Sequence, residues 1–195
     1  MKHMLRLMIL LSILFFASPA LSFQWNIDPD HTEIRFEIEH ILATVSGQFT
    51  DFKGDMVFDP AHPDTGRFDF TVNVKSINTN NGKRDTHLRS EDFFDSDKFQ
   101  TMKFVSSKIT RINNTLYSMQ GMMTIKDVTQ KLTLEFQFLG PKDHPFDAKK
   151  QVAGFKTEFV IPRLDYHVGN GKFLKMGVVG KDVAVTISME ALREK

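Results

Sequence analysis

The chain has 195 residues, with 25 Lys and Arg against 24 Asp and Glu, 19 Phe and no Cys. The absence of Cys excludes disulfides, thiolate catalysis, iron–sulfur clusters and cysteine-bound zinc. A net charge of +1 gives no basic field, so nucleic acid is not predicted as a partner, and neither is an anionic membrane surface.

Residues 1–22 have the layout of a secretory signal. Lys2 and Arg6 form a basic start, residues 7–16 are an apolar run, and small residues precede position 23 at both places that a signal peptidase reads. The run is short, because a membrane span needs about 20 residues. We therefore expect removal of this segment, export to the periplasm, and a working chain of residues 23–195 without a transmembrane segment.

The exported chain keeps 173 residues and, without Lys2 and Arg6, has a net charge of −1. That length is enough for one domain with a sizeable core. It retains 17 Phe, and with no disulfides it must be held together by apolar burial. Rings in this number can either fill a solid core or line an apolar cavity.

From residue 33 onward the dominant period of the sequence is two, as in half-buried strands. Six segments alternate clearly, namely 33–39, 45–58, 67–75, 131–138, 155–161 and 182–190, and 101–110 and 116–125 do so more weakly. Within the second segment the apolar positions change parity. This change predicts a bulge or a sharp bend, eased by Gly47 and Gly54.

Turn residues separate these segments, for example Asp59-Pro60, Asn113-Asn114 and Gly140-Pro141. One wet and one buried face on every strand predicts an antiparallel sheet. About eight short strands joined by hairpin turns predict a mainly β protein, either a barrel or a sandwich, in a single domain.

Residues 78–99 lack the two-residue period. Asn80 or Asn81 can cap a helix that runs through Arg89, and Ser90 can cap a second short helix. The apolar residues that would pack beneath these helices are Leu88, Phe93, Phe94 and Phe99. We interpret the interval as a helical lid or plug between strands.

Several segments resemble the bacterial YceI-like family. They include Asp28-Pro29-Asp30-His31-Thr32, Gly47-Gln48-Phe49 and Val179-Gly180-Lys181-Asp182; the most specific is Arg84-Asp85-Thr86-His87-Leu88 before Asp92-Phe93-Phe94-Asp95. The matching segments follow one another in order over essentially all of residues 23–195. Lys126-Asp127 stands where the family often has His-Gly, and we expect only a local change there.

The resemblance implies an antiparallel, lipocalin-like barrel of about eight strands with a short helical insertion. It also implies an elongated pocket for polyprenyl lipids such as isoprenoid quinones or polyprenyl phosphates. Parity shows which residues share a face, but it does not separate ligand contacts from core. The predicted lining is Phe36, Ile38, Phe49, Phe70, Val72, Phe104, Leu134, Phe136, Phe155, Phe159, Val185 and Ile187.

Three polar residues of the insertion have two interpretations. Arg84, together with Asp85 and His87, could contact a phosphate or quinone head group at the mouth of the pocket. Alternatively, Asp85 binds backbone or Arg and His87 packs under the helix, so that the three clamp a lid. Arg163 and Asp165 are interpreted in the same way, as a polar pair that holds a corner of the fold, which we call the corner lock.

No histidine pair has the spacing of a metal-binding motif, and no Gly-x-Ser-x-Gly nucleophile occurs. We therefore predict no metal, no cofactor and no catalytic residue. One alternative stays open, in which His31 and His40 approach each other in space and act with Asp30 on a metal or as acid and base.

The sequence thus favours a periplasmic, non-enzymatic carrier that sequesters a long-chain isoprenoid lipid. An enzyme acting on such a lipid through His31, His40, Arg84 and Asp85 is one alternative. A stress-related partner of a membrane quinone or cytochrome system is another, which an outward apolar patch near the lid would favour. A homodimer and a membrane protein that donates or accepts the lipid stay open as partners.

Overall fold

The computed structural model describes residues 23–195, so the predicted signal segment lies outside the described residues. In the described part, ten strands are assigned: β1 (Gln24–His40), β2 (Ala43–Phe49), β3 (Phe52–Val57), β4 (Arg67–Asn73), β5 (Ile77–Asn78), β6 (Thr101–Arg111), β7 (Leu116–Ile125), β8 (Val128–His144), β9 (Asp147–Pro162) and β10 (Val179–Glu194). The helical elements are α1 (Gly82–Arg89), α2 (Lys172–Lys175) and the 3-10 turns η1 (Pro63–Thr65), η2 (Val74–Ser76) and η3 (Arg163–Tyr166). None of the described helices is long and apolar enough to cross a membrane.

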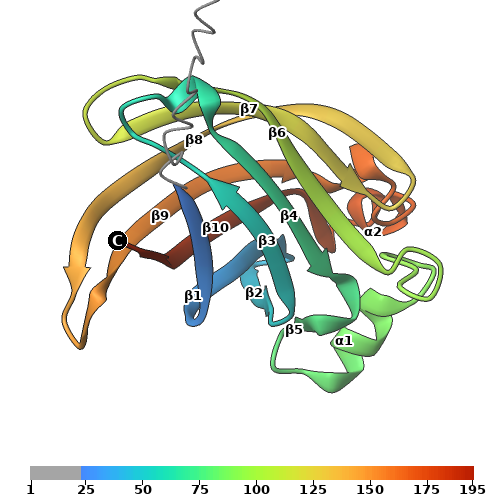
Figure 1. Ribbon diagram of the computed structural model, residues 1–195. Helices are drawn as coiled ribbons and strands as arrows, with labels where there is room; N and C mark the ends of the chain where they lie inside the picture. Colours follow the sequence, from blue (N-terminus) through green and yellow to red (C-terminus); the bar gives the residue numbers. More distant parts are fainter. Residues whose placement is uncertain (1–22) are drawn as a thin grey trace, which may run out of the picture.

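The strands form an antiparallel barrel, closed by pairing of β10 with β1 (Figure 1). β2 and β3 both pair with β1 and are separated by only two residues, so they act as one bent strand. β4 and β5 likewise run along β3 and β2. The wall therefore contains eight strands, which confirms the predicted mainly β fold and strand number.

The predicted change of parity in residues 45–58 is a bend at Thr50 and Asp51, which lie between β2 and β3 outside the ladder. Gly47 and Gly54 are not at this bend, so the expectation that they ease it is wrong. They lie within the strands, opposite Phe36 and Phe70, and make room for those rings.

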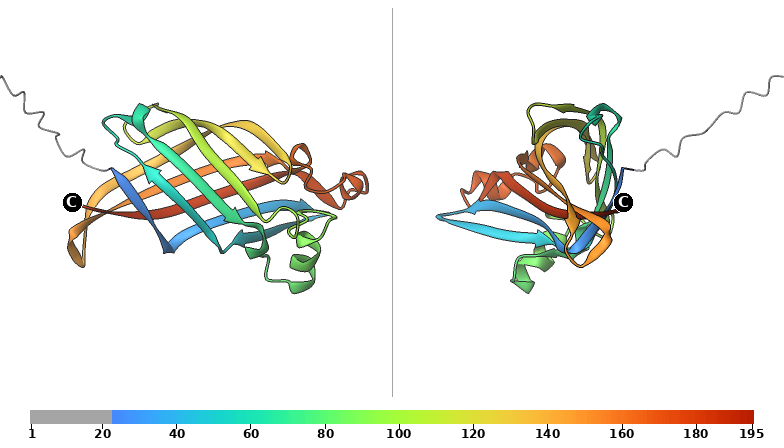
Figure 2. Two further views of the ribbon diagram at one scale, coloured as in Figure 1. Left: turned by 45° about the vertical axis from the view of Figure 1, so that its right-hand side comes forward. Right: turned by 60° about the vertical axis from the view of Figure 1, so that its left-hand side comes forward.

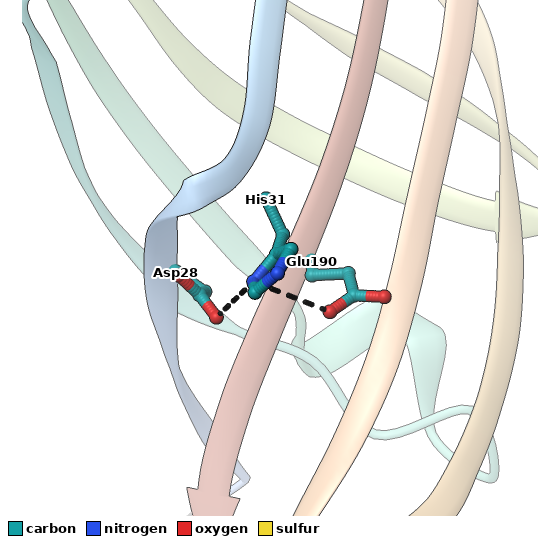
Figure 3. Close-up of side chains that lie close together, drawn as sticks. All are labelled: Asp28, His31 and Glu190. Carbon is teal, nitrogen blue, oxygen red and sulfur yellow. Dashed lines mark hydrogen bonds and ion pairs between the residues drawn. The ribbon is translucent and has the colours of Figure 1, made fainter.

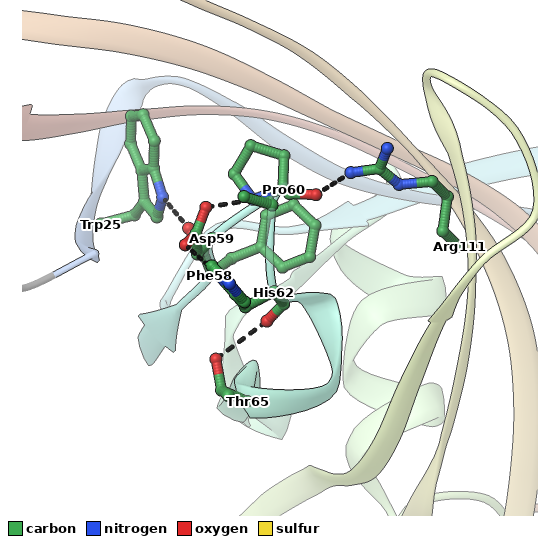
Figure 4. A network of polar contacts seen from close by, with 8 residues as sticks. Trp25, Phe58, Asp59, Pro60, His62, Thr65 and Arg111 are labelled. Atoms are coloured by element: carbon green, nitrogen blue, oxygen red, sulfur yellow. Dashed lines mark hydrogen bonds and ion pairs between the residues drawn. The ribbon is translucent and has the colours of Figure 1, made fainter.

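One end of the barrel is closed by aromatic side chains. The Phe58 ring makes edge-on contacts with the rings of Tyr117 and Phe138, at centroid distances of 5.0 and 5.1 Å, and Trp25 is fully buried beside them. Trp25 Nε1 donates to the Phe58 carbonyl at 2.9 Å (Figure 4). A ring this well packed on all sides leaves no passage through this end.

The loop that follows Phe58 is held by its own polar groups (Figure 4). The Asp59 carboxylate accepts from the Ala61 N–H at 2.8 Å and pairs with His62 Nδ1 at 2.9 Å. Thr65 Oγ1 donates to the His62 carbonyl, and Arg111 donates to the Pro60 carbonyl. These bonds fix the loop across the closed end.

The other end is covered by a lid made of α1, residues 90–100, η3 and α2 (Figure 2). Asn81 caps α1, since its side-chain oxygen accepts from the Arg84 N–H at 3.1 Å. The predicted second helix after Ser90 is wrong. Residues 91–94 form turns, and the Ser90 hydroxyl bonds back to the His87 carbonyl at 2.7 Å.

Candidate functional site

A cavity of about 360 Å³ lies inside the barrel beneath the lid. Met56, Phe68, Phe136 and Phe155 line it and also belong to the closed-end core, so they form its floor. On β10 the lining residues extend from Val179 to Met189, and ten strand positions span about 33 Å. The volume falls within the range of about 300–1,000 Å³ that is usual for ligand pockets. The cavity is long, apolar and closed at one end.

The cavity is lined by all twelve apolar residues predicted from parity. Five of these, Phe49, Phe104, Leu134, Phe136 and Phe155, are buried in the core. The remaining seven keep half-exposed faces toward the cavity: Phe36, Ile38, Phe70, Val72, Phe159, Val185 and Ile187. Their contact with a ligand stays a prediction.

Glycines let three lining rings lie flat against the wall. A Cβ atom at Gly54 would lie 2.2 Å from the Phe70 ring, and one at Gly47 would lie 2.4 Å from the Phe36 ring. Gly121 offers the same space to Phe104 at 2.5 Å. Because each ring takes the space of a missing side chain, it covers backbone and leaves the centre of the barrel open.

Five methionines also line the cavity, and none was among the predicted lining residues, although Met56 and Met189 stand at apolar positions of the alternating segments. They are Met56, Met102, Met119, Met123 and Met189. Methionine is unbranched and polarisable, so it adapts to irregular apolar surfaces. Met119 and Met123 lie at positions of the same parity along β7, and this pattern could have identified these two residues from the sequence.

The lid places apolar rings over the cavity. Leu88, Phe93 and Phe94 line it as predicted for the insertion, and α2, which was not predicted, adds Phe173. Phe93 and Phe173 stack at a centroid distance of 5.7 Å. The fourth residue expected here, Phe99, does not line the cavity; the ammonium groups of Lys98 and Lys126 lie over its ring.

Arg84 and Asp85 both bind Thr79. Asp85 is buried and accepts from the Thr79 N–H at 2.9 Å and from its hydroxyl at 2.5 Å. Arg84 donates to the Thr79 hydroxyl at 2.8 Å and to its carbonyl at 2.9 Å. Arg84 lines the cavity, whereas Asp85 does not, and contact of either residue with a ligand stays a prediction. The arrangement matches the lid clamp.

His87 joins the two parts of the lid. Its ring lies edge-on to Phe93 at 5.1 Å and to Phe173 at 5.8 Å, and Nε2 pairs with Asp92 at 3.0 Å. His87 lines the cavity while packing in this way. It therefore adds a titratable side chain to the lining at the lid end.

Arg163 is a buried cation at the same end, 4% exposed. Nε donates to the Gly180 carbonyl at 2.7 Å, and the other guanidinium nitrogens donate to the carbonyls of Val168 and Val179 at 2.8 and 3.4 Å. Burial lowers the pKa of Arg163. The corner lock exists, but it is made with backbone carbonyls and not with Asp165.

Lys126 and Asp127 connect the β7–β8 turn to the lid. Lys126 Nζ donates to the carbonyls of Phe93 and His167 at 2.7 and 2.8 Å. The Asp127 carboxylate pairs with His167 Nδ1 at 3.1 Å. The pKa of Asp127 is lowered, first by its own backbone N–H and then by His167. We expected the effect of Lys126-Asp127 to stay within the turn, but these contacts extend it to the lid.

His31 and His40 do not approach each other. His31 lies on the outer surface in the bulge of β1, with Asp28 Oδ2 at 2.8 Å and Glu190 Oε2 at 4.0 Å (Figure 3). His40 pairs with Val179 at the other end of β10 and lines the cavity. The proposed acid–base or metal pair with Asp30 is therefore wrong.

The His31 group is a solvent-exposed ion pair. The pKa of His31 is raised, chiefly by its hydrogen bond to Asp28, and the same bond lowers the pKa of Asp28. Asp28, His31 and Glu190 form the one close group of potential metal ligands within residues 23–195. His31 is 65% exposed and Glu190 49%, so mutual pairing in water accounts for the geometry.

The chain is similar to known proteins in both sequence and fold. It is 31% identical to "Protein YceI" of Salmonella arizonae over 95% of each chain. Its fold matches BcnA of Burkholderia cenocepacia with a TM-score of 0.77 at 21% identity, over 85% of this chain and 99% of that one. It also matches a polyisoprenoid binding domain from Saccharophagus degradans with a TM-score of 0.62 at 12% identity, over 87% and 98%.

The model of the YceI-like domain matches residues 25–191, a range that reaches into all ten strands and contains every lid element described above. Together with the curated relative, this match extends over nearly the whole described chain. The chain therefore belongs to the YceI-like domain family.

Proposed function

We propose that this protein is a periplasmic carrier that sequesters a long-chain isoprenoid lipid, either a polyprenyl phosphate or an isoprenoid quinone, in the barrel cavity. The observation that carries the proposal is the cavity itself, which is closed at one end and lined by apolar side chains along β10 from Val179 to Met189. A polyprenyl tail offers no hydrogen bonds and needs only such a wall. Burial of several hundred Å² of tail contributes roughly 10 kcal/mol before association costs.

Two further observations support the class of ligand and the compartment. The Saccharophagus degradans protein with a similar barrel is a polyisoprenoid binding domain, although at 12% identity it supports the fold and only suggests the ligand. Residues 1–22 have the composition of an export signal. A lipid of this kind is insoluble in water, so its transport outside a membrane requires burial.

We place the head group at the lid end. The polar members of the lining there are Arg84 and His87 on α1, together with His40 and Arg163. A phosphate or a quinone carbonyl is an acceptor, and these side chains are donors. The tail then extends toward the floor at Phe136 and Phe155, where the lining is apolar.

We propose binding without catalysis. The four candidates for an enzyme do not form one site, because His31 lies on the outer surface and Asp85 lies outside the cavity wall. Arg84 and Asp85 are engaged with Thr79. Hydrogen bonds that stabilise a lid account for these residues without a reaction.

The test is native mass spectrometry and solvent extraction of protein isolated from the periplasm of expressing cells. We expect a bound lipid of polyprenyl mass, and we expect a Val185→Trp variant to lose it because the indole would fill the middle of the cavity. Ala184→Trp is the matched control. Ala184 is the preceding residue of β10 and is exposed on the outer face, so that variant should retain the lipid.

The outcomes separate the proposals. Protein that carries no such lipid and takes up none on addition would contradict the carrier. Equal lipid loss in both Trp variants would show that the cavity is not the binding site. Turnover of bound lipid that disappears in His40→Ala while binding persists would favour the enzyme instead.

A further inference from the structure

Four large apolar side chains are exposed together at the rim of the lid end. Ile41 and Leu42 form the β1–β2 turn and are 64% and 99% exposed. Leu174 and Met176, in and after α2, are 36% and 61% exposed. The Ile41 N–H donates to the Val178 carbonyl at 3.0 Å, which joins the two segments. We refer to these four residues as the rim patch.

The rim patch is continuous with the mouth of the cavity. His40, directly before Ile41, lines the cavity, and so do Phe173 and Val178 on either side of Leu174 and Met176. The hairpin and α2 lie at the same end of the barrel as α1 (Figure 2). A surface that covered the patch would therefore also cover the entrance.

The charged residues within the two segments that carry the patch have one sign. Residues 40–46 and 169–178 contain Lys172 and Lys175 and no Asp or Glu. Both lysines are exposed, and no ion pair of either is found within residues 23–195. The nearest acidic residue along these segments is Glu39, on the β1 side. The nearly balanced net charge of the chain, which argued against anionic surfaces, does not reveal this local excess of positive charge.

A small apolar group flanked by lysines suits a bilayer better than a protein partner. A standard protein interface takes about 20–30 residues a side, far more than this patch provides. A bilayer, in contrast, accepts single apolar side chains at its boundary, and anionic lipid attracts each nearby lysine. The chemistry therefore selects an anionic membrane surface as the occupant.

We propose that the rim patch, with Lys172 and Lys175, docks the lid end onto an anionic bilayer, so that the cavity mouth opens toward the membrane. This inference rests on the proposed carrier function, because it supplies the route by which a membrane lipid enters or leaves. On this proposal the partner of the outward apolar patch near the lid is a lipid surface and not a membrane protein.

The test is co-sedimentation of the protein, residues 23–195, with vesicles of phosphatidylcholine alone or with about one third phosphatidylglycerol. We expect binding to the anionic vesicles and little to the neutral ones. Each lysine near the surface contributes about fivefold in affinity, so Lys172→Gln with Lys175→Gln should lower binding about 25-fold. Leu42→Ser with Met176→Ser should lower it by about tenfold or more.

Phe146→Ser is the matched control. Phe146 is 94% exposed in the turn between β8 and β9, at the opposite end of the barrel (Figure 1). Its replacement removes a large, almost fully exposed apolar side chain but should leave vesicle binding unchanged. Equal losses in the control and the rim variants, or no binding to anionic vesicles, would overturn the proposal.

Two additional measurements keep this inference separate from the carrier function. Lipid added from ethanol and detected by native mass spectrometry reports on the cavity without any membrane, and the rim variants should load as the parent does. Sedimentation velocity identifies the other occupant. A dimer that becomes a monomer in Leu42→Ser would make the patch a contact between two copies and overturn membrane docking.

Discussion

The two ends of this barrel use the same kind of residue in opposite ways. At the closed end Trp25, Phe58 and Tyr117 are completely buried and pack edge to face across the barrel. Toward the lid, along the cavity wall, Phe36 and Phe70 lie over glycines and keep one face toward the cavity. Phe residues therefore form packed core where another ring lies opposite them, and cavity wall where a glycine lies beneath them.

The polar contacts that hold the two ends can also be compared. The closed end is fixed by short-range bonds within one loop, from Asp59 to Ala61 and His62, and by Trp25 and Arg111, which donate to carbonyls of the same stretch. The lid is held by long side chains that reach carbonyls of other segments, as Arg163 and Lys126 do. At both ends, side chains from distant segments therefore help to hold the backbone in place.

The largest effect should follow loss of packing at the closed end. Phe58→Ala removes a ring that contacts five other aromatic rings, and we expect it to lower the free energy of unfolding by about 3–5 kcal/mol. Urea unfolding measures this. As a control, Tyr117→Phe keeps the neighbouring ring and removes a buried hydroxyl with no partner within residues 23–195. That variant should be as stable as the parent or more so, and a large loss in it would refute this account of the end.

A smaller effect is expected at the lid, where Arg163→Met leaves three carbonyls without donors. We expect a loss of about 2–3 kcal/mol in the free energy of unfolding and faster hydrogen exchange in residues 163–180. Arg163→Lys should recover only part of it, because one ammonium cannot reach all three carbonyls. Full recovery by Lys would show that charge alone matters here.

Replacing a glycine that lies beneath a cavity ring tests the role of the cavity in lipid uptake. In Gly54→Ala the new Cβ takes the place of the Phe70 ring, which must turn into the cavity, at a cost of about 1–3 kcal/mol. Lipid uptake, measured by native mass spectrometry, should fall more than stability does. Gly82→Ala is the control, since a Cβ there meets nothing within 4 Å. Equal uptake by both variants would contradict the role of Gly54.

The smallest effect concerns the exposed pair on the outer wall. The raised pKa of His31 contributes stability below its ordinary value of about 6.5, which is lost as pH rises through the folded value. The lowered pKa of Asp28 contributes above its ordinary value, and this is lost as pH falls through the folded value. The pair is therefore strongest between these two ordinary values.

An NMR titration of the His31 ring measures this pair. We expect the pKa of His31 to drop toward its ordinary value in Asp28→Asn. Asp30→Asn is the control and should change it least, because Asp30 makes the smallest of the contributions to the raised pKa. An unchanged pKa in Asp28→Asn would show that the hydrogen bond does not set it.

Local chemistry predicted much of the wall but only part of the lid. Parity placed Phe70, Val72 and their counterparts on the inner face, because a strand side chain has only two directions to point. The Asn81 cap of α1 was visible for a similar reason. The turn after Ser90, the helix α2 and the position of Phe99 were not, because each depends on contacts with distant segments.

The sequence by itself determined the period-two strands, the bend near residue 50, the first lid helix and the inward-facing apolar set, because backbone geometry and side-chain alternation act over a few residues. Only the tertiary structure decided that Gly54 lies under Phe70, that Arg163 reaches three carbonyls, and that Ile41 meets Val178 at the mouth. Closure of the barrel brings these residues together across long stretches of chain. No local pattern specifies which residues will meet when a sheet closes on itself.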